Sequence, residues 1–337
     1  MSLMSLIAAL PKTELHLHIE GSLEPELMMA LATKHNVSLP YTTVEEVAAA
    51  YQFDSLQSFL DLYYLGASVL RDEEDFYCLM RDYLQRSHAQ GVVHCEIMFD
   101  PQTHTERGIG YDVFMPGFCR AIEEAKQNGG PSVLLILSFL RHLTEQEAIQ
   151  TLQDAKPYLD RITAVGLDSS EKGNPPEKFA RVFEQAGQHG LLKVAHAGEE
   201  GPASYIWSAL NTLQVDRIDH GVRCLEDPEL VEHLVQHQIP LTVCPLSNVK
   251  LCVYEKMEQH PLRDMLAKGL NVTVNADDPS YFGGYLLENY QALVTSLALT
   301  REEALTLIRN GFRASFLAPE QKQYWLDKIE QMADAHP

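Results

Sequence analysis

Short apolar runs recur along this chain, and segments with helical spacing separate them. The eight runs span residues 13–19, 92–99, 133–140, 163–168, 191–196, 217–220, 239–244 and 271–275. Gly91, Gly190 and Gly269 stand where intervening helices should stop. Continuously apolar strands that alternate with helices are typical of a parallel sheet, and eight of them can close into a barrel. The sequence predicts an α/β fold of the (β/α)8 TIM-barrel type, with a doubly wound open sheet as the structural alternative.

The chain has 337 residues, enough for one large domain with a substantial core. It contains no linker rich in Pro, Gly or Ser and no low-complexity tract. We therefore expect a single domain over residues 1–337, with a helical insertion at about 24–90 and a helical C-terminal tail from Thr300.

Charge and cysteine usage exclude several classes of protein. The 47 acidic and 26 basic residues give a formal net charge of −21, which repels nucleic acid and anionic membranes. The six cysteines form no CxxC pair, so buried thiols in a reducing cytoplasm are expected rather than disulfides. The apolar stretch at 6–10 follows no basic residue and ends before Pro11, so no signal peptide or membrane span is predicted.

His16 and His18 lie in the first apolar run, where the alternation of a strand points both imidazoles to one side. Alone, such a pair is more often polar surface than a metal site. Its candidate partners are His196 in HAGE, His220 in RIDHG, and Asp277 and Asp278 in NADDP. Each partner follows or ends an apolar run, and barrel enzymes build their sites at the C-terminal ends of strands. These six side chains are therefore predicted to meet at one mouth of the barrel.

The other histidines, such as His35, His88, His189, His233 and His237, lie in segments with helical spacing. For them we expect solvent exposure and no function.

These motifs resemble those of the adenosine/adenine deaminase family of the amidohydrolase superfamily. The matching segments are PKTELHLHIEGSLEPE, HAGEE, RIDHG, CPLSNVKL and NADDP, in the family's order over nearly the whole chain. The resemblance implies one Zn²⁺ per chain, with ligands His16, His18, His196 and Asp277. It also implies that Glu199 is the catalytic acid, that His220 orients or deprotonates the attacking water, that Asp278 binds the purine and that the backbone amide of Gly166 meets purine N3.

The chemistry explains these residue types. Neutral imidazoles and one carboxylate leave zinc a net positive charge and an open position, which lowers the pKa of a bound water toward ~7. An aromatic aminopurine resists attack unless N1 is protonated, and a neutral Glu199 would supply that proton. The structural alternatives are a helix cap for Glu199, a backbone contact for His220, and a turn before Pro279 for the aspartate pair. Iron or manganese can occupy similar ligands.

The substrate prediction depends on Glu20 and four loops. The adenosine-specific branch usually has aspartate where this chain has Glu20, and the longer side chain would fill space that a ribose needs. Glu20 is therefore a candidate substrate-binding residue. The loops FDPQTHTERGI, GLDSSEKGNPP, LSNVKLCVYEKMEQHP and ADDPSYFGGY resemble the adenine deaminase branch. The resemblance implies a reaction of purine salvage in which adenine and water become hypoxanthine and ammonia. The expected partners are this small-molecule substrate and water, with no nucleic-acid or membrane partner.

Three other functions stay open. One is deamination of adenosine or another 6-aminopurine, phosphorylated ones included, because Lys172, Arg223 and Lys250 lie near predicted strand ends. A second is a different amidohydrolase that cleaves a ring amide. Many such sites bridge two metals with a modified lysine at the end of strand four, where this chain has Gly-Leu-Asp-Ser-Ser. The third is a silent purine-binding protein, although no ligand or acid is missing.

The first part of the insertion carries an apolar stripe at helical spacing: Phe53, Leu56, Phe59, Leu60 and Tyr63. Such a stripe is more often core packing than a substrate gate, so we expect it to pack into the core. In the resembled family, however, helices inserted after strand one cover the pocket mouth.

Overall fold

The computed structural model describes residues 2–335, whose eight strands form one parallel sheet in chain order. The strands are β1 (Lys12–His18), β2 (Val92–Phe99), β3 (Ser132–Leu140), β4 (Ile162–Asp168), β5 (Leu192–Ala197), β6 (Arg217–His220), β7 (Leu241–Val243) and β8 (Val272–Val274). A parallel bridge between Leu17 and Asp277 joins the end of β8 to β1. The sheet is therefore a nearly closed barrel, and the predicted (β/α)8 fold is confirmed.

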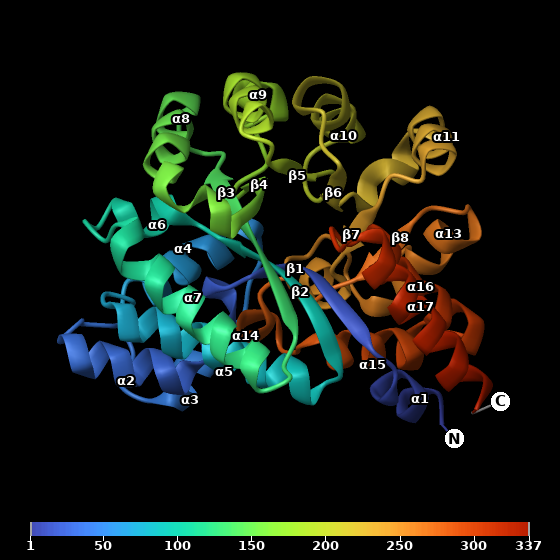
Figure 1. Cartoon of the computed structure of the whole chain (residues 1–337), viewed down its shortest axis with the longest axis horizontal. Coiled ribbons are helices and arrows are strands. Elements are labelled where there is room, and N and C mark those ends of the chain that lie inside the picture. Colours follow the sequence, from blue (N-terminus) through green and yellow to red (C-terminus); the bar gives the residue numbers. More distant parts are fainter. Residues whose placement is uncertain (1, 336–337) are drawn as a thin grey trace.

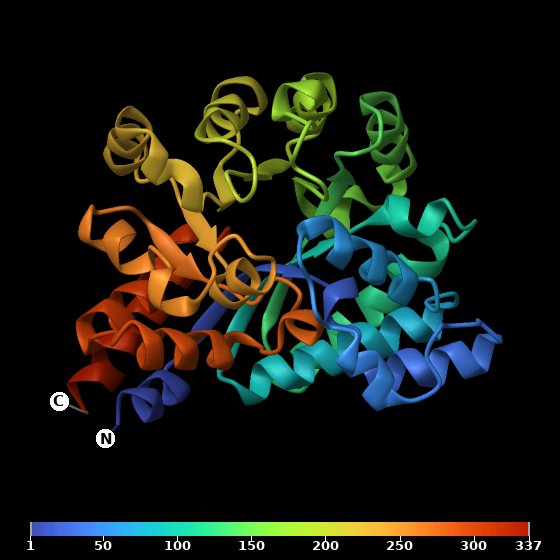
Figure 2. The same ribbon diagram turned by 180° about the vertical axis from the view of Figure 1, so that it is seen from behind.

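Helices surround the barrel (Figures 1 and 2). The helix α1 (Leu3–Ala9) precedes β1 and packs beside α15. The segment expected to be helical at about 24–90 forms α2 (Pro25–His35), α3 (Val44–Ala49), α4 (Leu56–Ala67) and α5 (Glu73–Ala89). Within residues 2–335, no helix combines the length and the apolar character needed to cross a membrane.

The helices after β2 complete the ring. They are α6 (Pro101–Thr105), α7 (Tyr111–Gln127), α8 (Glu145–Asp154), α9 (Ala180–Gln188), α10 (Ala203–Ser208), α11 (Pro228–His237), α12 (Pro245–Lys250), α13 (Leu262–Ala267), α14 (Pro279–Phe282) and α15 (Leu286–Ser296). The tail predicted from Thr300 consists of α16 (Arg301–Ala314) and α17 (Pro319–Asp334). In Figure 1, α8 to α11 lie along one side of the barrel, and α16 and α17 lie on another.

Local sequence fixes the starts of several helices. The Thr144 hydroxyl accepts the N–H of Glu147, whose carboxylate accepts the N–H of Thr144 in return. Thr300 and Glu303 repeat this capping box at α16. Each box satisfies two backbone donors that the first turn of a helix leaves free, so α8 and α16 begin where the sequence directs.

A buried ion pair ties β6 to β2 inside the barrel. The Arg217 guanidinium donates to Glu96 Oε2 at 2.6 Å and to the Leu15 carbonyl at 3.1 Å, and both charged side chains are fully buried. It also lies 4.5 Å from the ring centre of Phe316, which follows α16. Burial favours the neutral acid, but the charge of Arg217 and the contacts with His94 and the Phe316 N–H together outweigh it and lower the pKa of Glu96. The pair therefore joins three strands and the C-terminal tail.

We expect Arg217→Ala to lower the free energy of unfolding by about 3–5 kcal/mol, because Glu96 would stay buried without its partner. The matched control is Arg161→Ala, whose exposed guanidinium pairs with the neighbouring Asp160 at 3.3 Å. That change should cost less than about 0.5 kcal/mol. Urea unfolding followed by circular dichroism measures both, and equal stability of the two variants would contradict this assignment.

Candidate metal centre and active site

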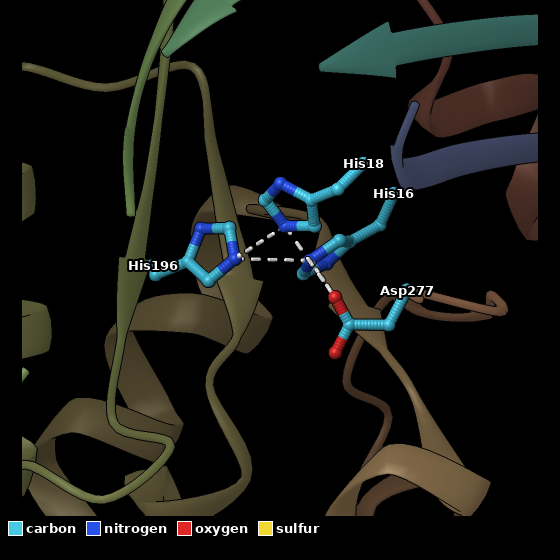
Figure 3. A group of neighbouring side chains, drawn as sticks. All are labelled: His16, His18, His196 and Asp277. Carbon is cyan, nitrogen blue, oxygen red and sulfur yellow. Dashed lines mark hydrogen bonds and ion pairs between the residues drawn. The ribbon is translucent and has the colours of Figure 1, made fainter. Parts of the chain in front are cut away.

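Four buried side chains converge at the C-terminal mouth of the barrel (Figure 3). His16 and His18 come from β1, His196 from β5, and Asp277 from the segment after β8. The Nε2 atom of His196 lies 3.1 Å from that of His16 and 3.2 Å from that of His18. Asp277 Oδ1 lies 3.3 Å and 3.4 Å from the same two Nε2 atoms. The structure thus brings together the four ligands that the resemblance implied.

The spacing of these atoms fits one metal ion that all four share. Zinc binds imidazole nitrogen and carboxylate oxygen at about 2.0–2.2 Å, which places two atoms bound to the same ion roughly 2.8–3.6 Å apart, depending on the angle between them. The four separations given above run from 3.1 to 3.4 Å. Three imidazole nitrogens and one carboxylate oxygen converge on the same small space. These donor atoms suit a divalent metal ion bound between them.

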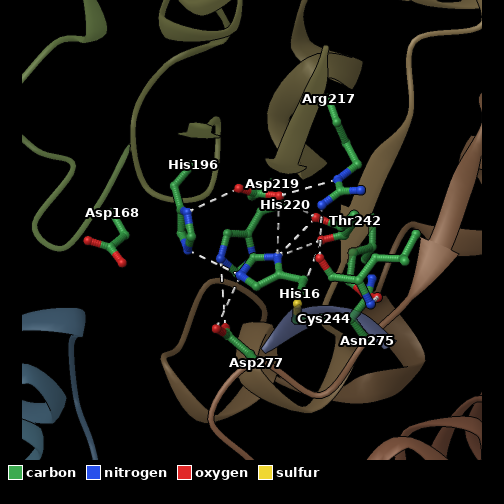
Figure 4. Close-up of polar contacts among 12 residues, drawn as sticks. His16, Asp168, His196, Arg217, Asp219, His220, Thr242, Cys244, Asn275 and Asp277 are labelled. Atoms are coloured by element: carbon green, nitrogen blue, oxygen red, sulfur yellow. Dashed lines mark hydrogen bonds and ion pairs between the residues drawn. The ribbon is translucent and has the colours of Figure 1, made fainter. Parts of the chain in front are cut away.

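The other ring nitrogen of each histidine faces an oxygen atom, and Figure 4 shows this for His16 and His196. The three pairs are His16 Nδ1 with Thr242 Oγ1 at 3.0 Å, His18 Nδ1 with Asp168 Oδ2 at 3.3 Å, and His196 Nδ1 with Asp219 Oδ2 at 3.5 Å. Thr242 in turn donates its hydroxyl to Asp219 at 2.8 Å. Oxygen neighbours favour a proton on each Nδ1, which leaves each Nε2 lone pair free for the metal.

Asp277 reaches the two histidines of β1 because its backbone binds that strand. The His18 N–H donates to the Asp277 carbonyl, and the Asp277 N–H donates to the His16 carbonyl, both at 3.0 Å. Asp277 has φ of 63°, as does His220 at the end of β6. Residues other than glycine rarely adopt this left-handed backbone conformation, which costs on the order of 1–3 kcal/mol. Such strained residues are concentrated at functional sites.

Glu199 and His220 lie beside the ligand cluster. His220 Nε2 is 3.6 Å from Glu199 Oε2 and 3.7 Å from Asp277 Oδ2. Glu199 Oε1 is buried and has no hydrogen-bond partner in the protein. Burial, with the negative charge of Asp277, raises the pKa of Glu199 well above its usual range. Burial also lowers the pKa of His220 well below its usual range, so a protonated acid stands beside a neutral imidazole.

One carboxylate fixes the loop that carries Glu199. Glu171 accepts four consecutive backbone N–H groups, at distances of 2.7–3.1 Å. The donors are Gly198, Glu199, Glu200 and Gly201. Sequence reasoning missed Glu171, although it lies three residues beyond the end of β4 in the quoted segment GLDSSEKGNPP.

A cavity opens beside the metal ligands, and α4 covers part of it. Its lining consists of His18, Leu56, Phe59, Leu60, Tyr63, Tyr64, Asp100, Asp168, Ser169, His196, Glu199, His220, Leu251, Asp277 and Asp278. The stripe on α4 belongs to the apolar core, as predicted, but Leu56, Phe59, Leu60 and Tyr63 also form a wall of the cavity. Helical periodicity shows that a face is buried, and it does not show whether that face meets packed core or a cavity.

Sequence reasoning also missed three buried carboxylates. Asp100 and Asp168 line the cavity at the ends of β2 and β4, and Asp219 faces His196 from behind. Burial raises the pKa of Asp168 to about 7 and, with the charge of Asp168, that of Asp100 well above its usual range. Asp168 ends β4, Asp100 directly follows β2 and Asp219 is the last residue but one of β6, so the rule that selected the histidines could have selected them.

Two predicted substrate-binding residues lie outside the cavity lining. Glu20 is buried behind it, where its carboxylate lies 2.7 Å from His104 Nε2 and accepts from the Tyr63 hydroxyl at 3.3 Å. Gly166 lies within β4, where a Cβ atom would approach Ser138 Oγ to 2.7 Å. Close packing therefore explains the glycine.

Within residues 2–335, the expectation that the remaining histidines are exposed is wrong for three of them. The buried ones are His94, His104 and His260. His94 lies 3.1 Å from Glu96 and His104 lies 2.7 Å from Glu20, so carboxylate oxygens meet both rings in the interior, and His260 lies 3.1 Å from the Asn248 side-chain oxygen.

Comparisons with known proteins place the chain among its relatives. The family model described as adenosine deaminase matches residues 11–332. The chain belongs to the adenosine deaminase family. Two relatives named adenine deaminase match almost end to end. The protein from Hahella chejuensis is 57% identical over 98% of this chain and 99% of the relative, and that from Wolinella succinogenes is 55% identical over 97% and 99%.

Solved structures of the family agree with this fold. The crystal structure of adenine deaminase from Arthrobacter aurescens is 49% identical, with a TM-score of 0.95 over 97% of this chain and 100% of the other. An amidohydrolase from Burkholderia ambifaria with bound zinc is 25% identical, with a TM-score of 0.88 over 98% and 94%. The family that the sequence motifs resemble is thus confirmed.

We expect the purified protein to bind one zinc ion. Loss of a residue that only contacts a metal ligand typically lowers metal affinity by about 10–100-fold. Loss of the ligand itself, in His18→Ala, should therefore weaken zinc binding by at least roughly 100-fold. The control is His35→Ala. His35 faces Asp75 at 2.7 Å in a different His/Asp cluster, and its loss should leave zinc affinity unchanged. Competition with a chromophoric chelator measures both affinities. Equal losses in the two variants would place the metal elsewhere.

Proposed function

We propose that this chain is a zinc-dependent adenine deaminase that converts adenine and water to hypoxanthine and ammonia in purine salvage. Near full-length relatives of that name, at 54–57% identity, support the substrate. One structural observation carries the reaction type: the four metal ligands, Glu199 and Asp278 all border or adjoin the same cavity.

The metal would be held by His16, His18, His196 and Asp277, whose nitrogen and oxygen donors suit zinc. The zinc-bound amidohydrolase from Burkholderia ambifaria, a structural neighbour, supports this choice of ion. When bound, zinc activates water as a nucleophile near neutral pH.

Glu199 supplies the proton that makes the aromatic ring reactive toward the oxygen nucleophile. Its buried, neutral carboxyl group donates to N1 of the base, so that the neighbouring carbon accepts the oxygen nucleophile. The resulting carboxylate takes the remaining proton from the added hydroxyl group and gives it to the departing amino group, which leaves as ammonia. The proton that His220 accepted from the water then returns to Glu199. Glu171 keeps the backbone of Glu199 in place during this cycle.

His220 and Asp278 position the reactants. The neutral imidazole of His220, between Glu199 and Asp277, can orient the attacking water and accept its proton. Asp278 Oδ1 is buried and unpartnered, and burial, with the charge of Asp277, raises the pKa of this carboxyl group. A neutral Asp278 can therefore donate to N7 of the base.

The charge of the cavity disfavours a phosphorylated substrate. Five carboxyl groups line it, and no lysine or arginine does among the described residues. The basic residues that left this alternative open are engaged elsewhere: Lys172 with Glu200, Arg223 with Glu226, and Lys250 with the Tyr51 carbonyl. The lining therefore offers an anionic phosphate no positively charged side chain to bind.

Glu20 would act on the substrate through its neighbours. Its carboxylate contacts Tyr63 and the backbone N–H of Asp100, and both of these residues line the cavity. We assign it a positioning function that narrows the pocket where a ribose would lie. Gly166 would serve by letting β3 and β4 approach closely below the site.

The direct test is the initial rate of ammonia release from adenine and from adenosine by zinc-loaded protein. We expect kcat/KM for adenine to exceed that for adenosine by a factor of at least about 100, since an obstructed sugar costs several kcal/mol. A preference for adenosine would overturn the proposed substrate while leaving the family and the metal site in place.

Glu199→Gln should keep the zinc and the fold and lower kcat by roughly 10²–10⁴-fold, because an amide cannot cycle a proton. The matched control is Glu200→Gln, whose largely buried side chain faces the exposed Lys172 and lies outside the cavity lining, so this change should alter kcat less than about twofold. Timed assays of ammonia release measure kcat for both variants, and the zinc content of each is determined in parallel. Loss of zinc from Glu199→Gln would instead assign that residue to the metal site.

A further inference from the structure

The strands β4 and β5 lose contact with each other before they reach the active site. Within the described strands, their pairing covers residues 164–165 of β4 and residues 192–193 of β5. With their other neighbours, both strands stay paired further, to Asp168 on β4 and to Ala197 on β5. At the mouth of the barrel, the loop after β4 and the end of β5 therefore need another contact to hold them together.

Arg141, the residue directly after β3, supplies such a contact. Its side chain is fully buried. The Nε atom donates to the Asn174 carbonyl in the loop after β4 at 2.9 Å, and Nη1 donates to the His196 carbonyl on β5 at 2.6 Å. The backbone N–H of Arg141 donates to the Asp168 carbonyl at 3.0 Å, which fixes the residue to the end of β4. The guanidinium thus joins two segments that the sheet hydrogen bonds leave apart.

Glu171 joins the same two segments. It lies in the same loop as Asn174, whose N–H donates to the Glu171 carbonyl at 3.1 Å, so the contact of Arg141 with Asn174 also restrains Glu171. The Glu171 side chain in turn accepts the N–H groups of residues 198–201, directly after β5. Arg141 therefore restrains both segments between which Glu171 makes its contact with the backbone of Glu199.

We propose that Arg141 is a positioning residue for the catalytic acid. By tying the loop after β4 to the end of β5, it lets Glu171 hold Glu199 where the proton transfers require it. This inference rests on the proposed function, in which Glu199 moves the protons. Arg141 lies outside the cavity lining, so it acts through these contacts and not on the substrate. A displacement of about 1 Å at a reacting group can lower the rate roughly 100-fold.

Support of the metal site is the competing role, because one acceptor of Arg141 is the carbonyl of the ligand His196. The backbone of His196 is already held by the pairing of β5 with β6, where its partner is Asp219. The Asp219 carboxylate also faces the imidazole of His196, at 3.5 Å. Loss of Arg141 should therefore displace the loop of Glu199 more than the ring of His196.

The test compares Arg141→Met and Arg141→Lys, each in the wild type and in the Glu199→Gln background. Methionine removes every donor, while lysine keeps the charge and can reach one of the two carbonyls. The matched control is Arg263→Met, outside the cavity lining, whose guanidinium donates to the Leu297 carbonyl at 3.1 Å and to Glu303 at 2.8 Å. Timed ammonia release from adenine gives kcat and KM, chelator competition gives zinc affinity, and thermal unfolding gives the folded fraction.

We expect Arg141→Met to lower kcat by about 10–100-fold at a temperature where the variant is folded. The KM for adenine and the zinc affinity should change less than about threefold, and hydrogen exchange at residues 198–201 should become faster. Arg141→Lys should lose less activity than Arg141→Met, and it carries the comparison if Arg141→Met does not fold. Arg263→Met should keep kcat within about twofold of the wild type and leave that exchange unchanged.

The Glu199→Gln background shows whether Arg141 acts through Glu199. Without a proton cycle to misplace, adding Arg141→Met should lower the residual kcat by less than about threefold. The inference is overturned by equal losses in both backgrounds, by a loss of zinc that parallels the loss of kcat, or by a loss of kcat no larger than the loss of folded protein. If the wild type acts on adenosine and not on adenine, the proposed substrate alone fails, and the same comparison with adenosine tests Arg141.

Discussion

Two backbone hydrogen bonds between β1 and the segment after β8 determine both the fold and the site. They run from the His18 N–H to the Asp277 carbonyl and from the Asp277 N–H to the His16 carbonyl. The same contacts that bring the barrel close to closure thereby set the Asp277 carboxylate against two imidazoles of β1. The metal cluster is thus a direct consequence of barrel topology. Asp277 adopts a strained, left-handed backbone conformation at this junction.

A second layer of oxygen atoms makes this cluster chemically specific. Thr242, Asp168 and Asp219 each face the Nδ1 atom of one ligand histidine. They come from β7, β4 and β6, so the outer layer links strands that the metal ligands themselves do not. Glu171 has the same function for the loop of Glu199. The rigid surroundings hold neutral imidazoles and a protonated acid within one small volume.

Sequence alone could predict what depends on local periodicity and on barrel geometry. The bounds of β2 and β6 agree with the apolar runs to the residue, and the ligands were found because strand ends share one mouth. The positions of Glu20 and Gly166 were less predictable. Glu20 turns away from the cavity because His104 and Tyr63, far along the chain, bind its carboxylate. Those contacts depend on where α4 and α6 pack, and no local pattern encodes that.

The central claim is that one metal ion lies between His16, His18, His196 and Asp277, and anomalous diffraction at the zinc edge tests it most directly. Crystals of the zinc-loaded protein should give a single strong peak within about 2.0–2.2 Å of all four ligand atoms. A peak at another histidine cluster, or no peak despite bound zinc in solution, would contradict the account.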